Sequence, residues 1–403
     1  MKGAAVDDLQ DIDGSYIRRL ISLLEHTPRP LKIFIFAMEH WYNPDGTKRE
    51  DRTGIHVPND YIFSLSDRHP QYFEPVPSIH PYRPDALQEL KRCYKKGARL
   101  IKWLPNSMGM DPADERCDLF YDKMKKYGMV LLSHTGAEHT VDAYMKQNLG
   151  NPLRLRRPLD RGVQVVAAHC ASEGKAEDLD DPKKPVVSAF KLFLRMMDEE
   201  KYDGLLFGDI SACVAFKRIG SPLATIIDRT DLHPRLLHGS DYPLPAINLV
   251  VHTRALRKRG YITKKERELL NEIYAFNPLL FDFVTKRTLR SPRHHNRFSP
   301  CVFMRHPDLQ IYDYQKLSTA QNKKKAKKKK DTSNKDDIVE TKQTRPTKTK
   351  NKNKNKNKKQ RKEQEKQDVE EEKGKEKKDD DKEKEKEKAK EESNMEESEE
   401  KEE

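Results

Sequence analysis

Short apolar runs alternate with amphipathic stretches from residue 31 to about residue 290. The runs are rich in leucine or β-branched residues and are flanked by Gly, Pro, Asn or Asp, which is typical of buried strands. The stretches between them, such as 84–96 and 118–127, have the periodicity of helices, and the pattern repeats at the length of a βα unit. It predicts seven strands: Leu31–Met38, Phe73–Ile79, Ala98–Leu104, Met129–His134, Val163–His169, Gly204–Ile210 and Arg235–Ser240.

Seven parallel strands fit either an open doubly wound sheet or a barrel that lacks its eighth strand. The open sheet would be favoured by a G-x-G-x-x-G motif or a phosphate-binding loop, and the sequence contains neither. Ionisable residues end four of the strands at Lys102, His134, His169 and Asp241, with spacings of one, one and two βα units. Such strand ends converge on one site in a (β/α)8 barrel. We therefore predict an α/β fold, a TIM-barrel-like domain whose first strand is missing.

The N-terminal region departs from this pattern. Residues 11–26 predict the helix that would follow the first strand, and residues 1–10 are too polar to form a buried strand. No apolar run has the length of a signal peptide or of a membrane span, so we expect neither secretion nor membrane insertion. Five scattered cysteines without a C-x-x-C pair favour a reducing compartment, so we expect the cytoplasm or the nucleus.

The C-terminal region has a different composition from the rest of the 403-residue chain. Residues 321–403 are Lys- and Glu-rich, with hardly any residue to bury, and such a segment cannot form a core. We predict a barrel domain over 1–300, a linker over 301–320 and a disordered low-complexity tail over 321–403. The basic half, 321–360, contains KKKAKKKK, which could direct nuclear import or bind nucleic acid or acidic partners. A solvating extension is the simpler interpretation.

Three strand-end residues have side chains that bind metals. His134 stands in VLLSHTG, His169 in VVAAHC and Asp241 in LLHGSDYPLP. Imidazole nitrogens and a carboxylate are good ligands for zinc or a similar divalent ion. One strand-end histidine alone is more often structural, but three such residues at barrel spacing predict a metal site.

With these motifs the chain resembles the amidohydrolase superfamily, in particular its amidohydrolase-related branch of metal-dependent hydrolases and decarboxylases. The resemblance covers residues 15–290, and GSDYP is among its more specific motifs. It implies one or two divalent ions, with zinc as the first expectation. It also implies that His134, His169 and Asp241 bind metal, that His169 acts on water in some members, and that Asp241 accepts a proton from the attacking water.

Two further positions bear on this resemblance. Lys102, in GARLIKWLP, matches the position where some members carry a carboxylated lysine that bridges two metals, and an ion pair in the barrel mouth is the alternative. The H-x-H of the family's first strand is absent. Either the chain is truncated at its N-terminus or the protein is a degenerate member. The intact remaining motifs favour truncation.

Several residues that follow the strands could bind a small-molecule substrate. His80 and Arg83 follow the second predicted strand, and Glu138 and His139 follow the fourth. Arg154, with Arg156 and Arg157 beside it, would suit a carboxylate or a phosphate, although loop-anchoring salt bridges explain these arginines equally well. Asp209 and Ser211, in GDISA, could support the ligands. Residues 277–283 are expected to form the last helix, with no chemistry implied.

These features lead to one main functional prediction and two alternatives. The prediction is a metal-dependent hydrolase in which activated water attacks an amide, ester or lactone carbonyl, with Asp241 as the general base. A decarboxylase of the same branch would use the same ligands. A binding or scaffold protein without catalysis is the other alternative, since the H-x-H is absent.

Overall fold

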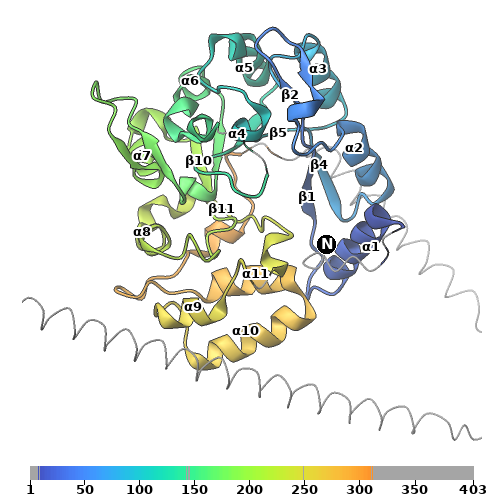
Figure 1. The fold of residues 1–403 in the computed structure, drawn as a ribbon. Coiled ribbons are helices and arrows are strands. Elements are labelled where there is room, and N and C mark those ends of the chain that lie inside the picture. The colour runs from blue at the N-terminus through green and yellow to red at the C-terminus, as the bar shows by residue number, and fades with distance from the viewer. Residues whose placement is uncertain are drawn as a thin grey trace, which may run out of the picture. The chain divides into compact units, whose positions relative to one another are not determined.

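The computed structural model describes residues 8, 10–141, 143, 146–247, 249–309 and 311. All seven predicted strands are present, each inside its predicted range (Figure 1). They are β1 (Ile33–Phe36), β4 (Phe73–Val76), β5 (Leu100–Trp103), β6 (Val130–His134), β7 (Val165–Ala168), β10 (Leu206–Asp209) and β11 (Leu236–Leu237).

The seven strands are parallel neighbours in the order of the chain. β1 pairs with β4, and β5, β6, β7, β10 and β11 form one five-stranded sheet. The amide of Lys102 donates to the carbonyl of Pro77 at 2.9 Å, which joins the segment after β4 to β5. No strand pairing joins β11 to β1 in the part of the chain that the structure describes. The fold is therefore the predicted α/β, TIM-barrel-like arrangement with seven strands.

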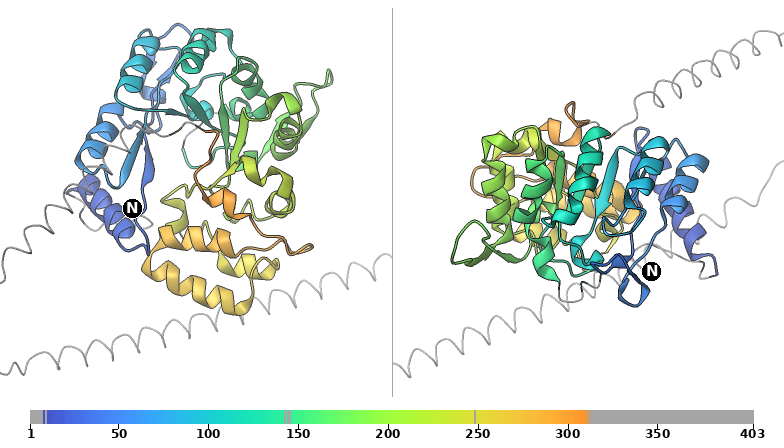
Figure 2. Two further views of the ribbon diagram at one scale, coloured as in Figure 1. Left: turned by 180° about the vertical axis from the view of Figure 1, so that it is seen from behind. Right: turned by 90° about the horizontal axis from the view of Figure 1, so that it is seen from above.

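Helices cover the outside of this curved layer of strands (Figures 1 and 2). The helices expected over 11–26, 84–96 and 118–127 are confirmed as α1, α3 and α5. The bounds of the α-helices are α1 Ile12–Glu25, α2 Asn59–Arg68, α3 Ala86–Lys95, α4 Pro105–Met108, α5 Asp118–Lys126, α6 Arg156–Asp160, α7 Ala189–Met197, α8 Ser221–Asp228, α9 Thr253–Lys258, α10 Lys264–Phe276 and α11 Pro278–Thr288.

Two short hairpins extend the loops that follow strands of the barrel. β2 (Trp41–Tyr42) pairs antiparallel with β3 (Lys48–Arg49) after β1, and β8 (Lys175–Glu177) pairs antiparallel with β9 (Val186–Ser188) after β7. Both hairpins belong to the loops at the carboxyl ends of the strands, the end of a barrel where sites form.

Successive strand residues face opposite sides of the layer, because side chains alternate along a strand. One set points to the helices and joins the main core, as Ile101, Leu131 and Val165 do. The other set forms a separate buried cluster that fills the inside of the barrel: Val76, Leu100, Val130, Leu132, Val166, Ala168 and Phe207, with Phe34 and Leu237 beside them. The direction of every later residue on these strands follows from this alternation.

The chain beyond residue 300 contacts the barrel as far as it is described. Pro300–Phe303 is a 3-10 helix with Val302 buried, and Leu309 joins the cluster inside the barrel. The linker expected over 301–320 is thus described only to residue 311, and the tail expected over 321–403 lies outside the described residues. Among the described helices, none has the length and apolar character needed to cross a membrane.

Candidate active site

The strand-end residues point into the barrel because they continue its inward-facing positions. Lys102 follows Leu100 by two residues, and His134 follows Leu132 by two. Asp209 stands in the same relation to Phe207. Lys102, His134 and Asp209 are all buried, so polar groups replace the apolar cluster at the carboxyl ends of the strands.

His134 presents one ring nitrogen that has no partner in the described structure. Its Nδ1 lies 3.5 Å from Oε2 of Glu138, whose other oxygen accepts hydrogen bonds from the amides of Thr140 and Val141. Its Nε2 is buried and makes no hydrogen bond. The ring packs edge to face against that of His169, with centroids 5.1 Å apart and planes at 67°. Because a buried nitrogen without a partner is costly, Nε2 is the atom that a ligand would satisfy.

His169 is held by a short chain of hydrogen bonds to Asp209. The carboxylate of Asp209 accepts from the backbone amides of His169 and Ser211 and from the Ser211 hydroxyl. That hydroxyl has one proton and gives it to Asp209, so at Nδ1 of His169, 2.8 Å away, it can only accept. His169 therefore carries its proton on Nδ1, and its Nε2 keeps a free lone pair.

The backbone is left-handed at two of the site residues. His169, Cys170 and Ala171 have φ values of 58°, 51° and 49°, and Asp241 has φ of 58°. Residues other than glycine seldom adopt these angles, and each costs on the order of 1 kcal/mol or more. The sharp bends turn the chain directly after β7 and after β11, which places His169 and Asp241 at the barrel mouth.

Burial dominates the electrostatics of this cluster. It lowers the pKa of Lys102, while the negative charges of Asp241, Asp209 and Glu138 oppose the shift. It also lowers the pKa of His134 well below the usual value, helped by the neighbouring His169 and Lys102. The pKa of His169 is lowered by burial too, against the charge of Asp241. Both imidazoles are thus held neutral, which is the form that binds metals.

Two imidazole nitrogens and a carboxylate are a donor set that a divalent ion accepts. The unpartnered Nε2 of His134 and the fixed tautomer of His169 fit such an ion, and Asp241 is close enough for its charge to act on both His169 and Lys102. Lys102 makes no ion pair within 4.0 Å among the described residues, and its Nζ lies 5.9 Å from the Phe36 ring centroid. The structure therefore places His134, His169, Asp241 and Lys102 at the same end of the barrel, but among the described residues the ligand atoms of His134, His169 and Asp241 do not all lie within 4.8 Å of one another.

Helix α11 contributes a buried ion pair to the site. Nζ of Lys286 lies 2.8 Å from Oδ2 of Asp282 and donates to the carbonyl of Gly239, also at 2.8 Å. Both side chains are completely buried, and Gly239 stands two residues before Asp241. The sequence analysis expected no chemistry from this helix. An acid and a lysine one helical turn apart, Asp282 and Lys286, were the available signal in the sequence.

Asp282 gives the protein an unusual pH dependence. Burial raises the pKa of its carboxyl from 3.8 to about 6, although Lys286 opposes the shift. The folded state then holds more protons than the unfolded chain between these values, so the free energy of unfolding falls as pH rises through them, by up to about 3 kcal/mol. In Asp282→Asn this contribution disappears. Urea unfolding from pH 4 to 7 should show the wild type losing stability relative to the variant. Parallel curves would contradict the assignment, and Asp67→Asn is the exposed control.

Buried Arg218 is a site neighbour that the sequence did not reveal. Its Nε lies 3.2 Å from Oε2 of Glu173, and it donates to the hydroxyl of Ser172 at 3.1 Å. Its positive charge contributes to the lowered pKa values of His134 and His169. Arg218 follows β10 in an irregular segment, where no pattern of the sequence marks it.

The predicted substrate residues His80 and Arg83 are engaged inside the chain. His80 is completely buried, with Nε2 3.0 Å from the Met108 carbonyl and Nδ1 3.1 Å from the Tyr82 amide. Arg83 pairs with Glu39 and with Asp85, at 2.6 Å in each case. Arg83 therefore connects the loops that follow β1 and β4, and His80 connects those that follow β4 and β5.

The other predicted substrate residues are in salt bridges. Arg154 pairs with Asp111, and His139 lies 3.4 Å from Glu173 with about half of its side chain exposed. The two arginines beside Arg154 pair with carboxylates of neighbouring helices and loops: Arg156 with Asp180 and Glu199, and Arg157 with Asp118. Of the predicted substrate group, Glu138 contacts a predicted metal ligand, His134.

Ser211 offers a direct test of the hydrogen-bond chain behind His169. Ser211→Ala removes the hydroxyl that accepts from Nδ1 at 2.8 Å and leaves only the longer contact of 3.2 Å to the Ser211 carbonyl, so the ring is held less firmly. We expect the affinity for zinc to fall about 10- to 100-fold, as for other partners of metal-binding histidines. Isothermal titration calorimetry measures it, and Ser188→Ala, whose hydroxyl makes no capping bond, is the control. An unchanged affinity would show that His169 does not need this support.

Comparison with known proteins finds similarity at the level of structure only. No family model and no curated protein matches the sequence. An uncharacterized TIM-barrel protein from Bordetella bronchiseptica is 15% identical, over 63% of this chain and 86% of its own, with a TM-score of 0.41. A probable 2-pyrone-4,6-dicarboxylic acid hydrolase from Acinetobacter baumannii is 12% identical, over 73% and 88%, with a TM-score of 0.40. A 4-oxalomesaconate hydratase from Rhodopseudomonas palustris is 16% identical, over 71% and 87%, with a TM-score of 0.37. These likenesses are partial, and the chemistry of the site rests on its own side chains.

Proposed function

We propose that this protein is a metal-dependent hydrolase whose ion is held by His134, His169 and Asp241 at the carboxyl ends of the barrel strands. The observation that carries the proposal is the pair of facing, neutral imidazoles. His134 has a buried Nε2 without a partner, and the hydrogen bond to Ser211 leaves Nε2 of His169 free to bind. A divalent ion bound there would polarise a substrate carbonyl and acidify water.

Residues around the two histidines take the remaining roles in the proposed reaction. We assign the general base to Asp241, because its charge has the largest effect of any carboxylate on both Lys102 and His169. Asp209 and Ser211 keep the His169 ring in one orientation through the reaction. Burial of Lys102 favours its neutral amine, the form that reacts with carbon dioxide, which supports carboxylation and a second ion.

The experiment combines metal content with a panel of substrates. The full chain is loaded with zinc or manganese and incubated with esters, lactones, amides and aromatic carboxylic acids. We expect hydrolysis of a carbonyl compound that disappears with a chelator and returns with the metal. Release of carbon dioxide from a carboxylic acid would show that the protein is a decarboxylase and not a hydrolase. Metal binding that is the same in the wild type and in His134→Ala would refute the site itself.

A further inference from the structure

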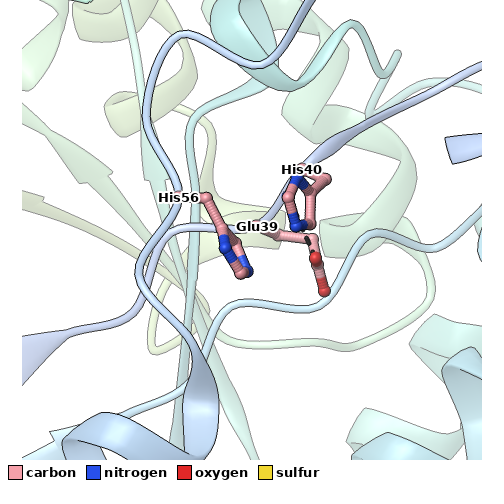
Figure 3. Close-up of side chains that lie close together, drawn as sticks. All are labelled: Glu39, His40 and His56. Carbon is pink, nitrogen blue, oxygen red and sulfur yellow. Dashed lines mark hydrogen bonds between the residues drawn. The ribbon is translucent and has the colours of Figure 1, made fainter. Parts of the chain in front are cut away.

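We propose that Glu39, His40 and His56 form a second site for a divalent transition-metal ion, made of none of the residues of the site described above. Each of the three offers one ligand atom, and these atoms lie within 4.8 Å of one another (Figure 3). Relaxation of the side chains by an ångström or so would bring them into the coordination sphere of one ion, since zinc–nitrogen and zinc–oxygen bonds are about 2.0–2.2 Å long.

The backbone holds the two histidines side by side. Glu39 and His40 follow β1, while His56 comes from the segment that returns after the β2–β3 hairpin. Met38 and Val57 join the two segments through a pair of backbone hydrogen bonds of 3.0 and 2.9 Å. The rings of His40 and His56 consequently stack, with centroids 3.6 Å apart. The two histidines are therefore held next to each other by a local backbone bridge.

The carboxylate of Glu39 is oriented from both sides. Its Oε1 accepts from the His40 amide at 2.9 Å, and its Oε2 accepts from Arg83 at 2.6 Å. Each carboxylate oxygen has a second lone pair left for a metal. Arg83 also donates to both carboxylate oxygens of Asp85, which balances most of its positive charge. The arginine then acts as a support for the metal-binding carboxylate.

The donor set determines which ions the site would prefer. Two nitrogens and one carboxylate oxygen suit zinc, cobalt or nickel far better than magnesium or calcium, which prefer oxygen alone.

A cavity of about 450 Å³ lies beside this cluster and leaves room for further ligands. Glu39 and His56 line it together with Ser78, Arg83 and Arg92. Three protein ligands with an open side are the arrangement in which an ion keeps a water or takes up a small anion.

The test counts zinc ions in the full chain after dialysis against buffered free zinc, and records the visible absorption of the cobalt-loaded protein. His56→Ala is the first variant, because His56 is exposed and its loss leaves the core intact. We expect about one ion per chain fewer than in the wild type, and a weaker cobalt spectrum. Exposed His294→Ala is the matched control and should retain every ion.

A second set of variants separates this site from the one formed by His134 and His169. In the His134→Ala/His169→Ala background we expect one zinc ion to remain, and to be lost when His56→Ala is added. Complete loss of zinc in the double variant would overturn the second site and leave the proposed function standing. Equal zinc content and equal cobalt spectra in wild type and His56→Ala would overturn it as well. Circular dichroism of each metal-free variant confirms that the fold is retained.

Discussion

Replacing Lys286 by methionine is expected to lower the free energy of unfolding by about 3–5 kcal/mol at pH 7. The side chain is completely buried, and its removal leaves the Asp282 carboxylate and the Gly239 carbonyl without their donor inside the protein. One oxygen of Asp282 already lacks a hydrogen bond among the described groups, so the pair has no spare partner to compensate. Urea unfolding followed by circular dichroism measures the loss.

The double variant Asp282→Leu/Lys286→Met tests the physical cause. With both charges removed, an apolar pair of similar volume replaces the ion pair, and most of the lost stability should return. If the double variant is as unstable as Lys286→Met, packing rather than the uncompensated charge accounts for the effect. Lys201→Met, on an exposed pair with Asp160, should leave the unfolding midpoint unchanged.

Asp241→Asn is expected to lower kcat for whichever panel substrate the protein hydrolyses by about 10²- to 10⁴-fold. Asparagine keeps the shape of the side chain but cannot accept the proton of water. It is also a weaker ligand, so zinc should bind less tightly, and kcat is compared at saturating zinc to separate the two effects. The steady-state rate against substrate concentration gives kcat and KM.

Asp67→Asn is the matched control, because Asp67 is an exposed carboxylate on α2. It should change neither kcat nor the bound zinc. An Asp241→Asn protein that keeps full kcat with its zinc in place would assign the general base to another group, and Glu138, 3.5 Å from His134, would be the next residue to replace.

The strands could be predicted because their signal is local. Runs such as Val130–His134 are buried on both faces, so a largely apolar run marks them, and all seven are confirmed. The placement of Lys102, His134 and His169 at strand ends, together with the shared direction of parallel strands, was enough to bring their side chains to one end of the barrel. The spacing of these residues along the chain was therefore sufficient to predict the candidate site.

The partners of these residues could not be predicted in the same way. Arg154, Arg156 and Arg157 have the same sequence signature whether they bind a substrate or a neighbouring carboxylate, and the structure places carboxylates beside all three. The same holds for His80, whose two nitrogens are occupied by Met108 and Tyr82. Which atom lies opposite a side chain depends on segments distant in the chain, and composition does not reveal it.

The amino-acid order alone was sufficient for the α/β class, the seven strands and the inward-pointing Lys102 and His134, because alternation and βα spacing are properties of neighbouring residues. Only the tertiary structure decided the tautomer of His169 through Ser211, the buried Asp282–Lys286 support beneath Gly239, and the meeting of His40 with His56. Each of these depends on a contact between segments separated by a loop or by several βα units. Contacts of that kind form when the whole chain packs, since burial and hydrogen bonding are then satisfied together.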